Sequence, residues 1–240
     1  KGAPKEKDSF LKSVQPIFQN PFEAFSSYRR VDAYLQTTAM RVDSVPRSAT
    51  VEVMTDALNA VGLKYVDVRG KYPNQFSGGE LQRISVARAL IPRPKMIIAD
   101  EPVSMIDASM RMNVVNLFLS IKQEYDTSFL YITHDLATAY YISDYVAVMY
   151  RGCIVEFGAA TDLLTNPAHP YTQLLLDSTA SITTKWDREG FVSSDMETKE
   201  YGLQGCKFYN RCPTAKDKCA VERPLAVKWA DGREVYCHSA

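Results

Sequence analysis

The sequence lacks three features that would assign it to a broad class at once. No run approaches the roughly 18 consecutive apolar residues of a membrane-spanning helix, so we expect no transmembrane segment in this polypeptide. Its 28 Lys and Arg residues balance 28 Asp and Glu residues, which leaves no basic excess to attract nucleic acid. The first ten residues contain no apolar core and so do not form a secretory signal. With 46% apolar and 23% charged residues, the composition is that of an ordinary globular protein.

Cysteine is scarce, and its distribution is uneven. One of the five cysteines, Cys153, stands alone, and the other four lie between residues 206 and 237. An odd count without a secretory signal argues against a disulfide framework. We interpret Cys153 as a small buried apolar residue in a strand, whereas the C-terminal four need a separate explanation.

The first part of the chain is mainly helical after a short strand. Residues 14–18 predict the end of a strand, and helices are expected over 31–42, over 51–61 and from about Gly79 to Leu90. In the third helix, apolar residues recur at three- and four-residue steps and form one apolar face. Prolines follow this helix and end it.

Strands and helices alternate in the next part. The expected strands, each a short apolar run, are 96–99, 128–133, 145–150 and 153–157. The expected helices are 114–121 and 136–143. We expect the first two strands to be buried on both faces and the last two to form a hairpin turning at Arg151-Gly152. This alternation predicts a mainly parallel sheet with helices on its faces.

The chain becomes less regular after Gly158. Two short helices are expected at 161–165 and 170–177. Residues 181–203 are polar and weakly patterned, and we interpret them as a linker.

A candidate anion site precedes the third helix. Ser77 is a natural N-cap, and Gly78 and Gly79 let backbone N–H groups approach a ligand without interference from a Cβ atom. The N-terminus of a helix suits a phosphate. A plain turn is the structural alternative for such a triplet.

Five segments in a fixed order resemble the motifs of the ATP-binding subunit of an ATP-binding-cassette (ABC) transporter. In chain order they are FQNP at 18–21 (Q-loop), FSGGE at 76–80 (signature motif), MIIADE at 96–101 (Walker B and catalytic glutamate), SMID at 104–107 (D-loop) and His134 (switch histidine).

The resemblance implies roles for the residues that match these motifs. Asp100 would hold Mg²⁺ through water, Glu101 would polarise the attacking water, and His134 would contact the γ-phosphate of ATP. The structural alternatives are an acidic strand end for the carboxylates and a purely structural histidine.

The remaining matching residues are implied to bind the nucleotide or to sense it: Gln19, Ser77, Gly78, Gly79, Glu80 and Asp107. Gln19 would sense Mg²⁺ and water, with its loop facing the membrane subunit. Asp107 would cross a dimer interface. Alternatively, it would be the N-cap of a helix that follows it and extends to Asn113. Glu80 departs from the family, which usually has glutamine, and Met105-Ile106 replace Ala-Leu.

The largest departure is the absence of the phosphate loop GxxxxGK[ST], to which none of the 11 glycines belongs. In the family this loop lies well before the Q-loop, whereas only 18 residues precede Gln19 here. We therefore expect the chain to start inside the nucleotide-binding domain and to bind ATP-Mg²⁺ weakly alone. Its signature motif could still serve a nucleotide that a partner holds.

The C-terminal part resembles the oligopeptide/dipeptide (nickel) importer branch of this family. HPYT at 169–172 resembles the start of a helix in that branch, and a proline-bounded helix start is also its structural alternative. In the branch's extension four such cysteines can hold a [4Fe–4S] cluster. The matching residues are Cys206, Cys212, Cys219 and Cys237. Four thiolates also suit Zn²⁺, which stays the alternative although the spacing does not match common zinc modules.

The resemblance implies a P-loop NTPase-type α/β fold that is N-terminally incomplete. We expect a partial ABC nucleotide-binding domain over 1–165, with an inserted helical subdomain at about 22–92, and a Cys-rich extension over 166–240.

The implied function is an ATP-hydrolysing subunit that energises the import of a solute, such as a peptide, from the cytoplasmic face of the membrane. The implied partners are a second ABC ATPase subunit, membrane permease subunits at the Q-loop and, indirectly, an external solute-binding protein, but no nucleic acid. The alternatives are a non-hydrolysing partner subunit and an ABC protein of repair or translation.

Overall fold

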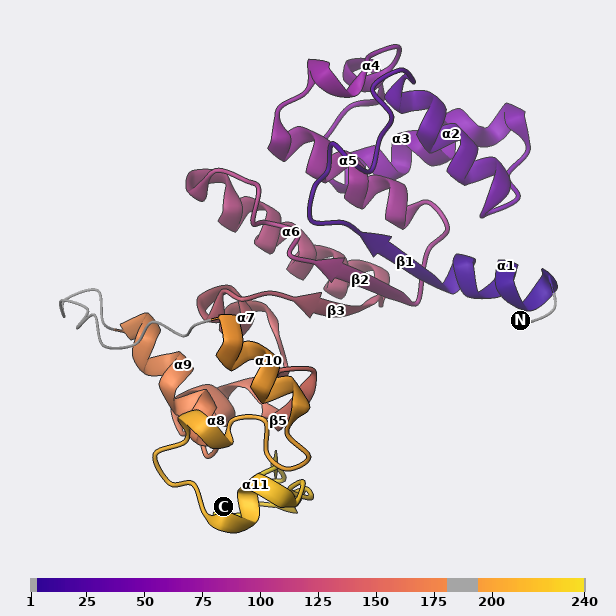
Figure 1. Ribbon diagram of the computed structural model, residues 1–240. Helices are drawn as coiled ribbons and strands as arrows, with labels where there is room; N and C mark the ends of the chain where they lie inside the picture. Colours follow the sequence, from indigo (N-terminus) through magenta and orange to yellow (C-terminus); the bar gives the residue numbers. More distant parts are fainter. Residues whose placement is uncertain (1–3, 181–193, 240) are drawn as a thin grey trace. The chain divides into compact units, whose positions relative to one another are not determined.

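The computed structural model describes residues 4–180 and 194–239, which form two compact units (Figure 1). Unit 1 comprises residues 1–134 and unit 2 comprises residues 135–240. The domain boundary expected after residue 165 stays a prediction. Among the described helices, none is long and apolar enough to cross a membrane.

Unit 1 is built on a three-stranded parallel sheet of order β1-β2-β3. The strands are β1 (Val14–Ile17), β2 (Met96–Asp100) and β3 (Ser128–Ile132). Ile17 lies opposite Ala99, and Asp100 lies opposite Ile132. The three carboxyl ends therefore lie at one edge of the sheet. Helix α1 (Pro4–Ser13), which the sequence pattern did not predict, leads into β1.

The expected helical region is confirmed in unit 1. It contains α2 (Val31–Arg41), α3 (Thr50–Ala60), the single-turn α4 (Tyr65–Val68) and α5 (Gly78–Leu90). Its core includes the fully buried side chains of Leu35, Leu58, Leu81 and Ile84, which come from three different helices. The apolar face predicted for α5 therefore packs against α2 and α3.

One face of the sheet is covered by α6 (Ala108–Tyr125). The Phe118 ring of α6 lies 5.5 Å from the Phe129 ring and 6.2 Å from the Tyr131 ring, centroid to centroid. The alternate residues of β3 point away from α6, and Leu130 and Ile132 remain 50% and 46% exposed. The prediction that this strand is buried on both faces is therefore wrong, because α6 covers only one of them.

Unit 2 contains a separate antiparallel sheet of order β4-β5-β7-β6. Its strands are β4 (Tyr145–Tyr150), β5 (Cys153–Ala159), β6 (Val227–Lys228) and β7 (Glu234–Val235). The hairpin expected between the first two is confirmed by their antiparallel pairing, and Arg151 and Gly152 have φ of 47° and 76°, the positive angles that a type I′ hairpin turn requires.

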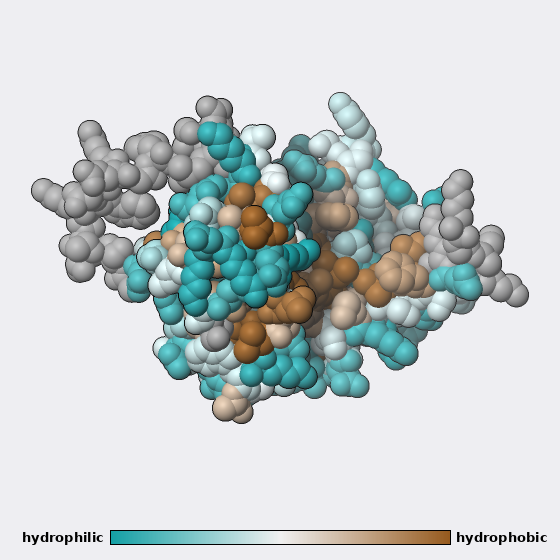
Figure 2. Space-filling view, turned by 60° about the horizontal axis from the view of Figure 1, so that its bottom comes forward, coloured by the Kyte–Doolittle hydropathy of each residue, from teal (hydrophilic) through white to brown (hydrophobic). Residues whose placement is uncertain are grey.

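Helices pack around this second sheet. They are α7 (Leu136–Ile142), α8 (Ala160–Thr165), α9 (Pro170–Ala180), α10 (Ser194–Gly202) and α11 (Asp217–Val221). Tyr150, Leu163 and Phe208 belong to the buried core of the unit. The face of the molecule in Figure 2 is largely hydrophilic, with apolar residues gathered in a few brown patches.

The segment interpreted as a linker is partly helical. Residues 181–193 lie outside the described part of the chain, but 194–202 form α10. Its Glu200 is fully buried and accepts hydrogen bonds from the Tyr150 hydroxyl at 2.6 Å and the Arg151 Nε at 2.9 Å. Burial, together with this carboxylate, raises the pKa of the Tyr150 hydroxyl. A buried polar contact thus orders a stretch that has no apolar periodicity.

Candidate functional site

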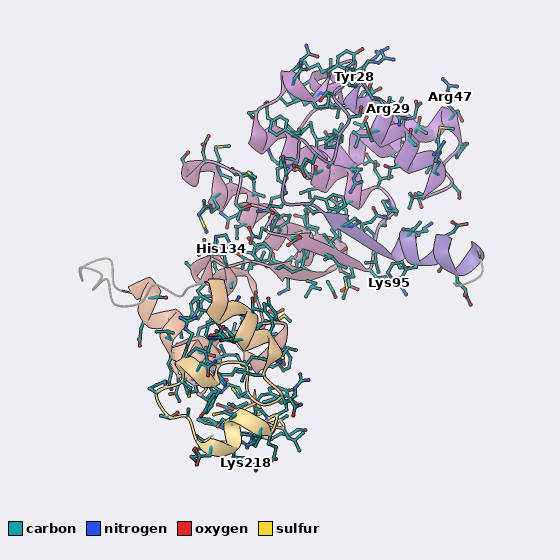
Figure 3. The ribbon with its side chains drawn as sticks, in the orientation of Figure 1. Tyr28, Arg29, Arg47, Lys95, His134 and Lys218 are labelled. Atoms are coloured by element: carbon teal, nitrogen blue, oxygen red, sulfur yellow. The ribbon has the colours of Figure 1, made fainter. Side chains whose placement is uncertain are left out.

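Three polar side chains meet where the strands of unit 1 end. Gln19 follows β1, Glu101 follows β2 and His134 follows β3. The Gln19 Nε2 donates to Glu101 Oε2 at 2.9 Å, and the His134 Nδ1 lies 3.0 Å from Glu101 Oε1. In Figure 3, His134 marks this end of the sheet and Lys95 marks the opposite end. The structure therefore brings both oxygens of one carboxylate into hydrogen bonds with neighbouring strand ends.

The backbone of Glu101 has an unusual conformation. Its φ is 40°, in the left-handed region that residues other than glycine rarely adopt, and Pro102 follows it, which restricts the preceding residue further. Such a position costs on the order of 1–3 kcal/mol and persists only where several contacts fix it. Here the Glu101 N–H donates to the Ile132 oxygen at 2.9 Å. The Glu101 carbonyl accepts from both Ser104 N at 3.1 Å and Ser104 Oγ at 2.9 Å.

Asp100 ends β2 and is exposed. Mg²⁺ usually binds one or two carboxylates and completes its octahedron with waters and substrate phosphates, so an exposed aspartate at the strand ends fits this ion. Among residues 4–180 and 194–239, no group of three or more His, Cys, Asp or Glu side chains could hold a metal ion alone.

The signature-like segment forms the N-terminus of α5, as expected. The Ser77 Oγ accepts from Glu80 N at 3.3 Å, and Glu80 Oε2 accepts from Ser77 N at 2.9 Å, which makes a capping box. The Ser77 N–H donor is the main reason why the pKa of the Glu80 carboxyl is lowered. Gly78 and Gly79 supply first-turn N–H groups that have no acceptor within the helix. These two groups are the donors available to an anion.

This helix end lies beside the loops that follow β1 and β2. A Cβ atom on Gly78 would lie 3.8 Å from the Met105 oxygen and 3.9 Å from the Phe22 ring, whereas one on Gly79 would meet open space. Gly78 therefore packs against the 101–107 turn, and Gly79 leaves room for a ligand.

Asp107 occupies the position before α6, but its side chain makes no capping hydrogen bond. Asp107 therefore takes the N-cap position of α6, as the structural alternative expects, but it does not make the capping bond. The structure adds Ser104 to the candidate site, because it bonds to the Glu101 carbonyl. The sequence analysis included Ser104 in the same segment but gave it no role of its own. The sequence signal was a serine three residues after a glutamate that precedes proline.

In unit 2 the HPYT segment belongs to a buried polar network. Glu156, which is 0% exposed, accepts from Ala168 N at 3.0 Å and His169 N at 2.9 Å, and it pairs with Arg233 Nη1 at 3.3 Å. Burial lowers the pKa of His169 to about 4, and its Nδ1 accepts from Tyr171 N at 3.0 Å. These contacts fix the turn that leads into α9. The segment therefore forms a proline-bounded helix start, which was its structural alternative.

Arg233 was not singled out in the sequence, although it is 1% exposed. Besides Glu156, its guanidinium donates to Asp231 Oδ2 and to the backbone oxygens of Asp162 and Asn166. The sequence signal for this buried arginine is Gly158, where a Cβ atom would lie 2.2 Å from the Arg233 Cγ. A lone glycine in a strand pattern signals such close approach only weakly.

The four C-terminal cysteines lie near one another without forming a metal site in the described residues. The Cys206 N–H donates to the Cys219 oxygen at 2.8 Å. The pKa of the Cys206 thiol is raised, first by burial and also by the neighbouring thiols of Cys219, Cys237 and Cys212. The iron–sulfur or zinc ligation stays a prediction: the structure brings the four side chains into one region, but among the described residues it shows no group of three arranged to hold a metal ion.

Cys153 differs from its prediction. It begins β5, as expected, but it is partly exposed rather than buried, and Arg223 Nη2 lies 3.7 Å from its sulfur. Cys153 lies at the hairpin end of β5, where the neighbouring Ile154 is exposed as well and the buried part of the strand begins only at Val155.

Two family profiles match the chain. One, described as "ABC transporter", matches residues 2–104, and the other, "Oligopeptide/dipeptide transporter, C-terminal region", matches residues 155–219. The chain is 35% identical over 242 residues to the "Di/tripeptide transport ATP-binding protein DppF" of Pseudomonas aeruginosa (strain UCBPP-PA14), an alignment that covers 100% of this chain and 74% of that protein. It is 36% identical over 238 residues to the "Oligopeptide transport ATP-binding protein AppF" of Bacillus subtilis (strain 168), with 98% and 72% covered.

A solved structure shares the fold. It is cbiO1 from Clostridium perfringens, described as part of the ABC transporter complex cbiONQ, and it aligns with a TM-score of 0.61 at 22% identity. The alignment covers 68% of this chain and 64% of that chain, so this chain spans just under two thirds of the solved relative's length.

Proposed function

The chain belongs to the family of ABC transporter ATP-binding proteins, which are ATPases, and from this we propose that it energises the import of peptides. The names of its relatives support the substrate class, because they are di/tripeptide and oligopeptide transport proteins. The observation that carries the catalytic part is Glu101, whose carboxylate is held between Gln19 and His134 at the strand ends.

In the proposed reaction Glu101 orients the attacking water and accepts its proton. Gln19 and His134 fix the direction of that carboxylate, and His134 also reaches the γ-phosphate. Phosphoryl transfer needs alignment and charge stabilisation more than covalent help from the protein, which suits side chains held by hydrogen bonds. Asp100 would hold Mg²⁺, which when bound neutralises phosphate charge.

We propose that Gly78 and Gly79 bind the phosphates of a nucleotide whose other side is held by a second ABC ATPase subunit, with Asp107 at the contact between the subunits. Support comes from the two first-turn N–H groups of α5, whose place at the start of a helix suits a phosphate. Glu80 would lie beside the nucleotide as part of the capping box.

The loop between β1 and α2, which contains Gln19, is the proposed contact with the permease subunits. It exposes three aromatic side chains, Phe18, Phe22 and Tyr28, and the last is 96% exposed. Figure 3 shows Tyr28 at the outer end of the helical part of unit 1. Exposed aromatic residues are common in protein interfaces. The chain would then lie at the cytoplasmic face of the membrane as a peripheral subunit, coupled indirectly to an external solute-binding protein.

Glu101→Gln in the assembled transporter tests the catalytic proposal. We expect ATP hydrolysis to fall about 10²–10⁴-fold while ATP still binds, because the amide cannot accept the proton. Glu124→Gln, on the exposed side of α6, is the matched control and should hydrolyse ATP at the original rate. Unchanged hydrolysis in E101Q, with hydrolysis lost when the partner subunit's glutamate is changed, would favour the non-hydrolysing alternative.

For the four cysteines, we propose a [4Fe–4S] cluster with Zn²⁺ as the alternative, supported by the mutual proximity of their thiols. Anaerobically purified protein should show broad absorbance near ~400 nm and contain iron and sulfide. Stoichiometric zinc would favour the alternative, and neither metal would contradict both.

A further inference from the structure

We propose that Ser104 is a positioning residue for Glu101, whose backbone its hydroxyl fixes so that the carboxylate meets Gln19 and His134. This inference rests on the proposed function, in which Glu101 acts on water. Ser104 itself reaches the backbone of Glu101 and not its carboxylate.

The first step of the argument is the strain at Glu101. A left-handed φ of 40° before a proline is a conformation that the residue would leave if its contacts allowed. The direction of the side chain depends on this angle, because the Cβ atom turns with the backbone. Any contact that keeps the backbone in place therefore keeps the carboxylate in place.

The second step is how few contacts can do so. Pro102 has no N–H, so the peptide group between Glu101 and Pro102 can be held only through the Glu101 carbonyl oxygen. That oxygen accepts from the Ser104 N–H at 3.1 Å and from the Ser104 hydroxyl at 2.9 Å. The first bond is available to most residues at the end of such a turn, but the second requires a hydroxyl.

The third step concerns the N–H side of Glu101. The Glu101 N–H is tied to the Ile132 oxygen of β3 at 2.9 Å, which fixes one peptide group to the sheet. Ser104 fixes the next peptide group, so the two together define the backbone angles of Glu101. Without the hydroxyl, each side is held by a single hydrogen bond, to the Ile132 oxygen on one side and from the Ser104 N–H on the other.

The test compares Ser104→Ala with Ser104→Thr in the assembled transporter. We expect kcat for ATP hydrolysis to fall about three- to tenfold in S104A, with KM for ATP unchanged, and to recover in S104T, which keeps the hydroxyl. Ser104→Cys keeps the size with a weaker donor and should lie between them, and it serves if the alanine variant does not fold. Ser178→Ala is the matched control, since the Ser178 Oγ also donates to a carbonyl three residues earlier, at 2.7 Å, in α9.

Glu101→Gln separates the two proposals. If E101Q abolishes hydrolysis but S104A matches the original protein, the positioning role is wrong and the catalytic role stands. If E101Q hydrolyses ATP normally, the catalytic role fails and the positioning role fails with it. An S104A variant that changes KM or thermal stability but not kcat, or whose loss S104T does not restore, would also overturn the inference.

Discussion

Glu101 in unit 1 and Glu156 in unit 2 are both glutamates with a basic neighbour, but their surroundings differ. Glu156 is 0% exposed and is held by a guanidinium and two backbone N–H groups, which are fixed donors. The Glu101 side chain is 28% exposed and is held by the flexible side chains of Gln19 and His134, on a strained backbone. A carboxylate enclosed by fixed donors serves the fold, whereas one held by movable donors at a surface can exchange them for a ligand.

The two histidines repeat this contrast. His169 is 1% exposed and accepts a backbone hydrogen bond, whereas the side chain of His134 is 75% exposed and its Nδ1 lies 3.0 Å from the Glu101 carboxylate. Motif resemblance drew attention to both residues, to His134 as the switch histidine and to His169 as part of the HPYT segment. Their burial separates the structural histidine from the one that can reach a nucleotide.

Removing the cation beside Glu156 should have the largest effect on stability. Arg233→Met leaves a buried carboxylate without its cation, so we expect the free energy of unfolding to fall by about 3–5 kcal/mol in urea titrations. Lys218→Met breaks the exposed pair with Glu222, at 3.3 Å, and should cost less than about 0.5 kcal/mol. Similar losses in both variants would remove the distinction between the two kinds of carboxylate.

The buried histidine should make stability depend on pH. The pKa of His169 is about 4 in the folded protein and about 6.5 in the unfolded chain, so between these values the unfolded state binds more protons. The contribution of His169 to the free energy of unfolding should therefore be fully present above about pH 6.5. It should fall by about 3 kcal/mol as the pH drops from 7 to 4.

Unfolding at several pH values in the original protein and in His169→Gln measures this contribution. Both proteins keep Glu156 and Arg233, the charged groups nearest the turn, so the difference between their pH profiles isolates His169. Parallel profiles would contradict the assignment of a buried neutral imidazole.

Changing Ser77, which caps α5 and also lies in the candidate site, should have the smallest effect on stability. Ser77→Ala removes the N-cap of α5 and should lower the free energy of unfolding by about 1 kcal/mol. Ser77→Asn keeps a capping oxygen and should restore most of the stability. If the asparagine variant is as unstable as the alanine variant, the capping box is not what holds this helix end.

Much of unit 1 could be predicted from the sequence, because its signals are local. The apolar period of α5, the proline stop after it and the cap at Ser77 lie within a few residues of one another, and the parallel strands place Gln19, Glu101 and His134 at one edge. The partners of Arg233 and Glu200 could not be predicted, since each is a polar residue paired across more than 45 positions of sequence. The exposed face of β3 was missed because an apolar run looks the same whether one or both faces are covered.

Calorimetric titration with ATP-Mg²⁺ is the most direct test of the central claim, that the N-terminus of α5 in unit 1 completes a nucleotide site whose phosphate loop a second ABC ATPase subunit provides. The chain alone should bind weakly, and binding should become tight when an ABC ATPase subunit with an intact phosphate loop is added. Tight binding by this chain alone, or no gain on adding the second subunit, would contradict it.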